Sequence, residues 1–341
     1  MTFRTNCPHF LTLFVLPIFA ARLAAQTPVD APPAPPMDPV RAIDAALRAV
    51  ETGDLRRAEQ LIRDVSITHP KMSKLNLANG MLQKELQRYA EAIQAFGLYN
   101  ATDEGKRDYR GWGAVGSVYL KSYMFTSAIG PLEKALDLVP LGEDGGLIKA
   151  RIALDLARVH LGLNDPKDAI KSIKNAAVSA PDAGEIQAEV CQLASRAGDT
   201  ETAIAAGVSA IQAFNSELSV NPLSVPAHQG LVRCYHVLYA EQSAKLSKNP
   251  NDGDSFVEGA KLLRAIAGLE QRIRLLDSRA LMLQALEANK DNAEWQLFAA
   301  ELEMDLGART EAAARIDAVL QSDGNNASAI ALKNRLNASA G

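Results

Sequence analysis

Aromatic residues are scarce in this 341-residue chain, at 5% of the total, although hydrophobic residues as a whole make up 48%. A core must therefore be built mainly from aliphatic side chains, and Ala and Leu recur throughout. These two residues are strong helix formers, whereas sheets are enriched in aromatic and β-branched residues. The composition favours an all-α fold over a β-sandwich or a barrel.

Cysteine is also rare, with Cys7, Cys191 and Cys234 as the whole complement. Three cysteines are too few for a disulfide-stabilised scaffold. Cys191 and Cys234 lie within helical patterns and have apolar neighbours, which favours two buried thiols. A disulfide between them is left open by the sequence.

Motifs of common catalytic and nucleotide-binding sites are absent. The chain has no Gly-x-Gly-x-x-Gly, no phosphate-binding loop, no Cys-x-x-Cys and no Gly-x-Ser-x-Gly. His228, Cys234 and His236 come nearest to a metal-ligand cluster, but their spacings of two, six and eight residues do not place them on one helix face. We therefore predict no enzyme activity, no metal and no cofactor.

A long apolar run occurs only near the N-terminus. Arg4 precedes the apolar stretch 10–21, and the small residues Ala24 and Ala25 follow it, which is typical of a secretory signal peptide. The stretch is shorter than the roughly 20 residues that cross a bilayer. We expect cleavage after Ala25, an exported protein that is periplasmic or extracellular, and no membrane span in the mature chain.

Positive charge is not in excess either. Loss of residues 1–25 removes Arg4 and Arg22, which leaves 34 basic and 40 acidic residues and a formal charge of −6. This balance disfavours nucleic acid as a partner.

Proline separates the N-terminal segment from the rest. Residues 27–39 are dense in proline, which excludes helix and favours an extended linker. From Val40 onward, apolar residues recur at helical spacing in segments of about 12 to 16 residues. We therefore divide the chain into a signal peptide (1–25), a linker (26–39), regular repeats (40–214), divergent helical repeats (215–338) and a tail (339–341).

A fixed period is visible beyond residue 40. Five alanines fall near the starts of expected second helices at separations of 34, 36, 41 and 34 residues: Ala58, Ala92, Ala128, Ala169 and Ala203. Four of them are followed twelve or thirteen residues later by a residue that ends helices: Pro70, Gly105, Pro140 and Pro181. Self-similarity at such a period indicates a helical repeat protein.

Two copies of the repeat are especially clear. One contains Trp112, Gly116, Tyr119, Ala128, Ala135 and Pro140, and the other contains Gly80, Tyr89, Glu91, Ala92, Ile93 and Phe96. These residues and spacings resemble the tetratricopeptide repeat, a family of helix-turn-helix units of about 34 residues. The resemblance implies a right-handed α-solenoid of about six to seven repeats, whose concave face binds a protein or peptide.

The pattern loosens after Ala203. We expect a lengthened helix before Asn221, a turn over 249–254, and then one long helix to Leu286 or two helices with a kink near 277–278. Residues 295–316 resemble a last degraded repeat, and 327–336 predict a short closing helix.

The resemblance also implies which residues face a partner, namely one row along the first helices of three central units. The row comprises Lys74, Leu77, Met81, Lys84, Glu85, Arg110, Gly113, Ser117, Leu120, Lys121, Arg151, Leu154, Arg158 and Leu161. Basic residues outnumber acidic ones six to one in it, which favours an extended peptide or C-terminal tail with carboxylates. The alternative is an ordinary solvated surface.

Two functions follow as hypotheses. The first is an exported, non-enzymatic adaptor or scaffold that binds a protein or peptide through the concave face. The second is a structural component of an envelope assembly, for secretion, cell-wall or outer-membrane biogenesis, that acts through the C-terminal helices. Those helices also leave room for homo-oligomer formation.

Overall fold

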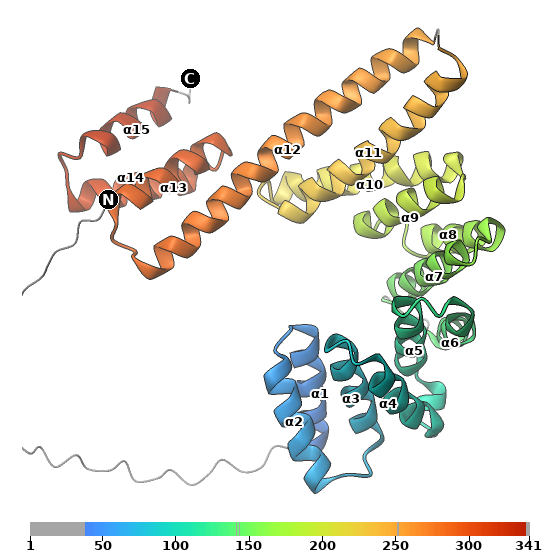
Figure 1. The fold of residues 1–341 in the computed structure, drawn as a ribbon. Coiled ribbons are helices and arrows are strands. Elements are labelled where there is room, and N and C mark those ends of the chain that lie inside the picture. The colour runs from blue at the N-terminus through green and yellow to red at the C-terminus, as the bar shows by residue number, and fades with distance from the viewer. Residues whose placement is uncertain (1–37, 141, 143, 251, 339–341) are drawn as a thin grey trace, which may run out of the picture. The chain divides into compact units, whose positions relative to one another are not determined.

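The computed structural model describes residues 38–140, 142, 144–250 and 252–338, which form helices joined by short turns, with no strand among them (Figure 1). The helices are α1 (Pro39–Glu51), α2 (Leu55–Thr68), α3 (Ser73–Glu85), α4 (Tyr89–Ala101), the 3-10 turn η1 (Gly105–Arg107), α5 (Tyr109–Lys121), α6 (Phe125–Leu138), α7 (Gly145–Gly162), α8 (Pro166–Ser179), α9 (Gly184–Ala197), α10 (Thr200–Val220), α11 (Val225–Lys248), α12 (Gly253–Ala288), α13 (Ala293–Asp305), α14 (Arg309–Ser322) and α15 (Ala327–Ala338). The predicted signal peptide, the linker up to residue 37 and the tail lie outside the described residues. Across the described helices, none combines the length and apolar character that a membrane span requires.

Consecutive helices pack as pairs, and the first helices of successive pairs also touch. Each of α1, α3, α5, α7 and α9 contacts its own second helix and the next first helix in the row. Contacts between neighbours in sequence therefore bury the core along the whole array, as in other solenoids. The predicted all-α repeat fold is confirmed.

The alanines that revealed the period occupy equivalent places. Each is the fourth residue of its second helix and is fully buried: Ala58, Ala92, Ala128, Ala169 and Ala203. A side chain this small lets two helices approach closely. The longer separations of 36 and 41 residues arise where η1 precedes α5 and where α7 extends to 18 residues.

Glycines mark the closest approaches between paired helices. A Cβ at Gly80 would lie 2.5 Å from the Phe96 ring, and one at Gly116 would lie 2.4 Å from Cγ of Leu132. Gly230 of α11 makes a similar close approach to Phe214 of α10, at 2.2 Å, but there the two helices belong to successive pairs. The paired helices therefore cross closely at Gly80 and Gly116, because neither position has space for a side chain.

One backbone turn recurs between paired helices, and we call it the corner. In five corners the residue after a left-handed residue donates its N–H to a carbonyl five residues earlier, over 2.7–2.9 Å. The left-handed residues are Gln87, Tyr123, Asn164, Gly198 and Gly307, with φ between 58° and 81°. This geometry is a common helix C-terminus, and it fixes how the second helix leaves the first.

The C-terminal helices are longer, as expected from the weaker periodicity. The helix before Asn221, α10, has 21 residues, and α12 runs as a single helix of 36 residues beside α11 (Figure 1). The sequence is compatible with either one helix or a kink near 277–278, and the structure has one continuous helix there. The predicted last repeat corresponds to α13 and α14, and α15 is the closing helix.

Cys191 and Cys234 are both fully buried and both free. Burial raises the pKa of the Cys191 thiol to about 12 and that of Cys234 to about 11. Both thiols therefore stay protonated at neutral pH, which makes them inert packing residues.

Candidate functional site

The first helices α7, α9 and α11 line a groove that we call the central groove. It consists of two adjoining hollows of about 610 and 620 Å³ that share Arg158, Glu189, Gln192 and Arg233. The first hollow lies over α7 and α9, and the second continues along α9 and α11. The groove therefore follows the row of first helices rather than a single helix pair.

Apolar and charged side chains alternate along the central groove. Its accessible apolar surface comes from the half-buried Leu147 and Val237, whereas Ile186 and Leu193, which also line it, are buried. Arg158 stands at the junction of the hollows and pairs with both Asp155 of its own helix and Glu189 of α9. Arg233 of α11 pairs with Glu185 over 2.5 Å. These ion pairs connect the three helices through their side chains.

Asp155 is the most desolvated charge in this region. Burial raises the pKa of its carboxyl above the ordinary value, against the opposing effect of Arg158, Lys84 and Lys121. Three first helices thus supply cations that act on one carboxylate.

Two cations of the central groove remain uncommitted. Arg151 at one end and Arg196 at the other are exposed, and neither forms an ion pair with the described residues. A guanidinium without a partner can donate two parallel hydrogen bonds to a carboxylate. These two side chains are therefore the places where the groove can take a negatively charged group.

A smaller hollow of about 370 Å³ lies between α1, α3 and α5. It is lined by Leu47, Val50 and Glu51 and by five residues of the predicted row: Leu77, Met81, Lys84, Glu85 and Arg110. The Arg110 guanidinium is already engaged, because its Nε and Nη2 donate to the Asp108 carboxylate over 2.6–3.0 Å. Arg110 therefore has less capacity for a ligand than the sequence suggested.

Asp108 is held from several sides. The Tyr99 hydroxyl donates to it over 2.5 Å, and the backbone N–H of Arg110 donates over 2.9 Å. Burial alone would raise the pKa of the Asp108 carboxyl, but the hydrogen bonds from Arg110 and Tyr99 outweigh it and hold the pKa below the ordinary value. Asp108 is consequently ionised at neutral pH, and it fixes Arg110 to the start of α5.

The structure divides the fourteen residues of the predicted row. Arg151, Leu154 and Arg158 line the central groove, and five line the smaller hollow. The six that line neither are Lys74, Gly113, Ser117, Leu120, Lys121 and Leu161. Leu77 and Leu154 have exposed fractions of 0% and 1%. This corrects our expectation for these two leucines, because their side chains pack in the core beneath the hollows.

The predicted excess of basic residues is also corrected. Counting one row of the first helices omitted the acidic residues that fold against it, among them Asp108, Glu185 and Glu189. The groove therefore carries both signs. Sequence analysis missed the α9 part of the groove, although the 34-residue period carries Arg151 to Glu185 and Arg158 to Gln192.

The three residues considered as metal ligands, His228, Cys234 and His236, have different environments. His228 is buried, and its Nδ1 donates to the Ser224 carbonyl over 2.7 Å. Cys234 is buried, whereas His236 is exposed and faces Glu270 at 3.7 Å. His228 is thus a buried packing residue.

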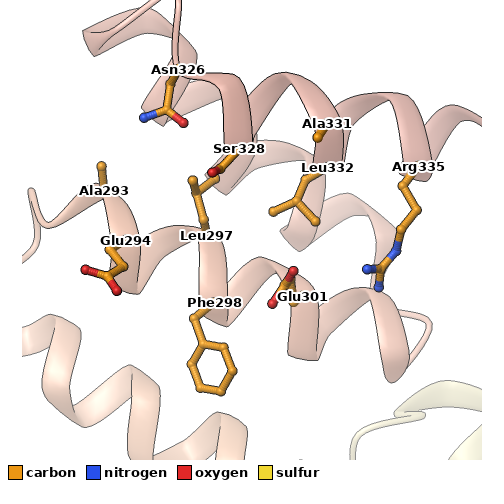
Figure 2. A pocket seen from close by; sticks show the side chains of 10 residues that line it. All are labelled: Ala293, Glu294, Leu297, Phe298, Glu301, Asn326, Ser328, Ala331, Leu332 and Arg335. Atoms are coloured by element: carbon orange, nitrogen blue, oxygen red, sulfur yellow. The ribbon is translucent and has the colours of Figure 1, made fainter.

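A further hollow of about 760 Å³ lies between α13 and α15. Figure 2 shows Leu297 and Leu332 between the two helices, and Phe298 directed away from α15. Glu294 and Glu301 stand on the α13 side, and Arg335 on the α15 side. Arg335 is paired with Asp305 at 3.4 Å. This hollow belongs to the closing repeat and is separate from the central groove.

Comparison with known proteins agrees with the class that this geometry defines. The family model of the tetratricopeptide repeat matches residues 154–217, which span the second half of α7 together with α8, α9 and most of α10. This segment is therefore a tetratricopeptide repeat segment, and it contains much of the central groove. No curated protein matches the chain.

Similarity to solved structures is distant. The Cut9–Hcn1 hetero-tetramer of the APC/C is 15% identical with a TM-score of 0.46, and the match covers 86% of this chain and 48% of that one. The chain thus spans about half the length of that relative. The MamA RS-1 ArsTM double mutant is 16% identical over 53% of this chain and 97% of that one, with a TM-score of 0.43. Another MamA crystal structure is 15% identical over 54% and 99%, with a TM-score of 0.42.

Proposed function

We propose that the protein is an exported, non-enzymatic adaptor that holds an extended peptide segment of another protein in the central groove. The observation that carries this proposal is the continuity of the groove across α7, α9 and α11, within and beyond the tetratricopeptide repeat segment. Grooves that combine apolar surface with a few fixed polar groups are suited to peptide recognition.

The side chains of the groove divide the work of recognition. Arg158 and Arg233 are neutralised by their own carboxylate partners, so they preorganise the groove instead of attracting charge. Arg151 and Arg196 take acidic groups of the peptide, and the apolar surface between them takes aliphatic or aromatic side chains. The preferred ligand is therefore an extended peptide with acidic residues flanking an apolar one.

A displayed library of random dodecamer peptides tests this proposal on the full chain. We expect enriched peptides to be acidic and apolar, and to bind the variant Arg151→Glu/Arg196→Glu about 10- to 100-fold more weakly, since a hydrogen bond to a charged group contributes about 1.5–3 kcal/mol. Binding is measured by fluorescence anisotropy with the enriched peptides.

The matched control is Lys134→Glu/Lys171→Glu. It changes the net charge equally, but it places the change on the second helices α6 and α8, at exposed lysines with no ion pair in the described residues. If both variants lose affinity equally, the effect is one of net charge. If the library yields no binder, or the groove variant binds as well as the wild type, the proposal fails.

Export is part of the proposal and rests on the sequence of residues 1–25. Expression of the full chain in a bacterium, followed by N-terminal sequencing of the protein from the envelope fraction, should give Gln26 as the first residue. Recovery of the uncleaved chain from the cytoplasm would contradict it.

A second candidate function is assembly through the C-terminal helices. Phe256, Val257 and Leu263 on the first half of α12 are exposed by 47–57%. Exposed apolar residues this close together favour an interface within an envelope assembly or between copies. If copies of the chain associate through this surface, analytical ultracentrifugation should show an oligomer that the variant Phe256→Asp/Leu263→Asp converts to monomer. A monomeric wild type would rule out the homo-oligomer.

A further inference from the structure

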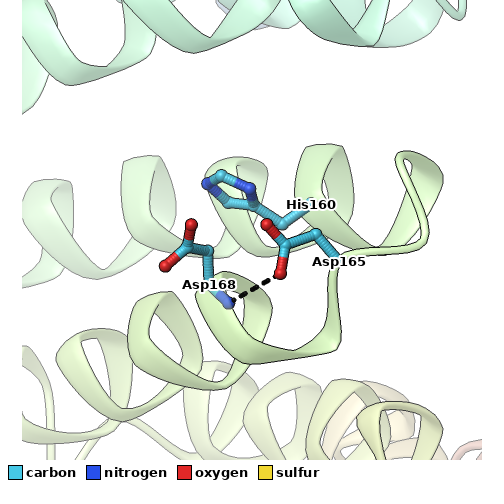
Figure 3. Close-up of side chains that lie close together, drawn as sticks. All are labelled: His160, Asp165 and Asp168. Carbon is cyan, nitrogen blue, oxygen red and sulfur yellow. Dashed lines mark hydrogen bonds between the residues drawn. The ribbon is translucent and has the colours of Figure 1, made fainter.

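Three metal-ligating side chains converge at one corner of the array, away from the central groove. His160 in the last turn of α7, Asp165 at the N-cap of α8 and Asp168 in the first turn of α8 offer ligand atoms that all lie within 4.8 Å of one another. Figure 3 shows the imidazole and the two carboxylates directed toward the same space. His160 and Asp165 are half-buried, and Asp168 is exposed.

The backbone fixes this convergence. Asn164 adopts the left-handed conformation, with a φ of 59°, and the Asp165 N–H donates to the His160 carbonyl over 2.8 Å. Oδ1 of Asp165 accepts the N–H of Asp168 over 3.2 Å, which leaves its second oxygen available. A main-chain hydrogen bond therefore holds His160 next to Asp165, and Asp168 lies close to both because it is in the first turn of α8.

The other corners show that the fold itself does not require such a cluster. At the positions equivalent to His160, Asp165 and Asp168, the α9–α10 corner has Ala194, Asp199 and Thr202. Asp199 there is paired with Lys174 at 3.3 Å. By contrast, the two carboxylates of the α7–α8 corner have no ion pair in the part of the chain that the structure describes. Two adjacent carboxylates repel each other, and a cation bound between them removes this repulsion.

We propose that His160, Asp165 and Asp168 bind a divalent transition-metal ion, with Zn²⁺ preferred over Mn²⁺ and both preferred over Mg²⁺ and Ca²⁺. Imidazole nitrogen favours Zn²⁺ over the oxygen-seeking alkaline-earth ions, and Mn²⁺ is at the weak end of the affinity order of the divalent first-row metals. Small rotations of the side chains bring the ligand atoms to the roughly 2.0–2.2 Å that Zn²⁺ bonds require, and water completes the coordination. The bound ion cross-links the end of α7 to the start of α8, and it does not depend on peptide binding.

Isothermal titration of the chelator-treated full chain with Zn²⁺ at pH 7.5 tests the proposal. We expect one equivalent to bind, and His160→Ala or Asp168→Asn to weaken binding by more than about 100-fold, because even losing a partner that only orients a ligand costs about 10- to 100-fold. Neither variant removes a core contact, and circular dichroism verifies that the helices are retained. Zn²⁺ should also raise the Tm of the wild type and leave that of His160→Ala unchanged.

His236→Ala is the matched control, because His236 also faces a carboxylate, Glu270, but without a third ligand. We expect it to bind Zn²⁺ as the wild type does. The proposal is overturned if no stoichiometric binding is seen, if His160→Ala and Asp168→Asn bind normally, or if Mg²⁺ and Ca²⁺ bind as tightly as Zn²⁺.

Discussion

A buried ion cluster in the last repeat, α13 and α14, gives the sharpest prediction for stability. Glu303 of α13 is fully buried, and its carboxylate is bonded to Arg279 of α12 at 3.0 Å and to Arg315 of α14 at 2.9 Å. One carboxylate thus joins three helices. Removing it in Glu303→Ala leaves two guanidinium groups facing each other without a counter-charge.

The expected cost follows from the burial of the three groups. Breaking a buried ion pair by removing one partner costs about 3–5 kcal/mol. The side chains of Arg279 and Arg315 are 20% and 21% exposed, so each can regain some hydration. We therefore expect a loss near the lower limit, about 3 kcal/mol, in the free energy of unfolding of this region.

Urea unfolding followed by tryptophan fluorescence measures this loss. In a Trp112→Phe background the signal comes from Trp295, which lies on α13 about two helical turns before Glu303. Asp305→Ala on the same helix is the control, because the exposed Asp305–Arg335 pair contributes at most about 1 kcal/mol. The reasoning is refuted if Glu303→Ala costs no more than this control.

Three further predictions concern the repeats. Gly116→Ala should lower the free energy of unfolding, measured by thermal unfolding, by about 1–3 kcal/mol, because the new Cβ would lie 2.4 Å from Leu132. The control Gly130→Ala places its Cβ where no atom lies within 4 Å, and it should raise the free energy of unfolding by about 0.5–1 kcal/mol. Equal effects of the two variants would contradict the close crossing at Gly116. Asp108 has a lowered folded-state pKa, so its stabilisation is complete above pH ~4 and is lost as the pH falls through the folded value. Asp108→Asn should therefore unfold more easily in urea at pH 7, by about 1–2 kcal/mol, with a difference that shrinks toward pH 2. Gln87→Gly should raise the Tm by relieving a left-handed residue that carries a Cβ, for a gain of up to about 1 kcal/mol, and an unchanged or lower Tm would contradict this.

Much of the fold could be predicted because each repeat needs the same residue types at equivalent positions. Ala58 and its equivalents are needed wherever two helices cross, and Gly80 and Gly116 are needed where a large side chain fills the same space. The single 36-residue helix α12 could not be settled from sequence, because continuous apolar periodicity does not distinguish one helix from two with a bend.

The candidate site could be predicted only in part, because side chains are placed by partners from other repeats. Arg151 and Arg158 of the predicted row line the central groove. The guanidinium of Arg110 is occupied by Asp108, and the row of first-helix residues does not reveal this because Asp108 is not part of it. The convergence of His160 with Asp165 depends on the left-handed Asn164, which spacing along one helix does not reveal.

The recurring corner has a consequence for how such a chain can change. Gln, Tyr, Asn and Gly all occupy its left-handed position, while the backbone hydrogen bond stays between 2.7 and 2.9 Å. Side chains around the turn can therefore be exchanged while the path of the main chain is kept. A ligand set that evolves at one corner can therefore be moved to another, and placing a histidine at Gln83 and aspartates at Arg88 and Glu91 of the α3–α4 corner, where none of the three side chains is buried, is a direct route to a second site in the same protein.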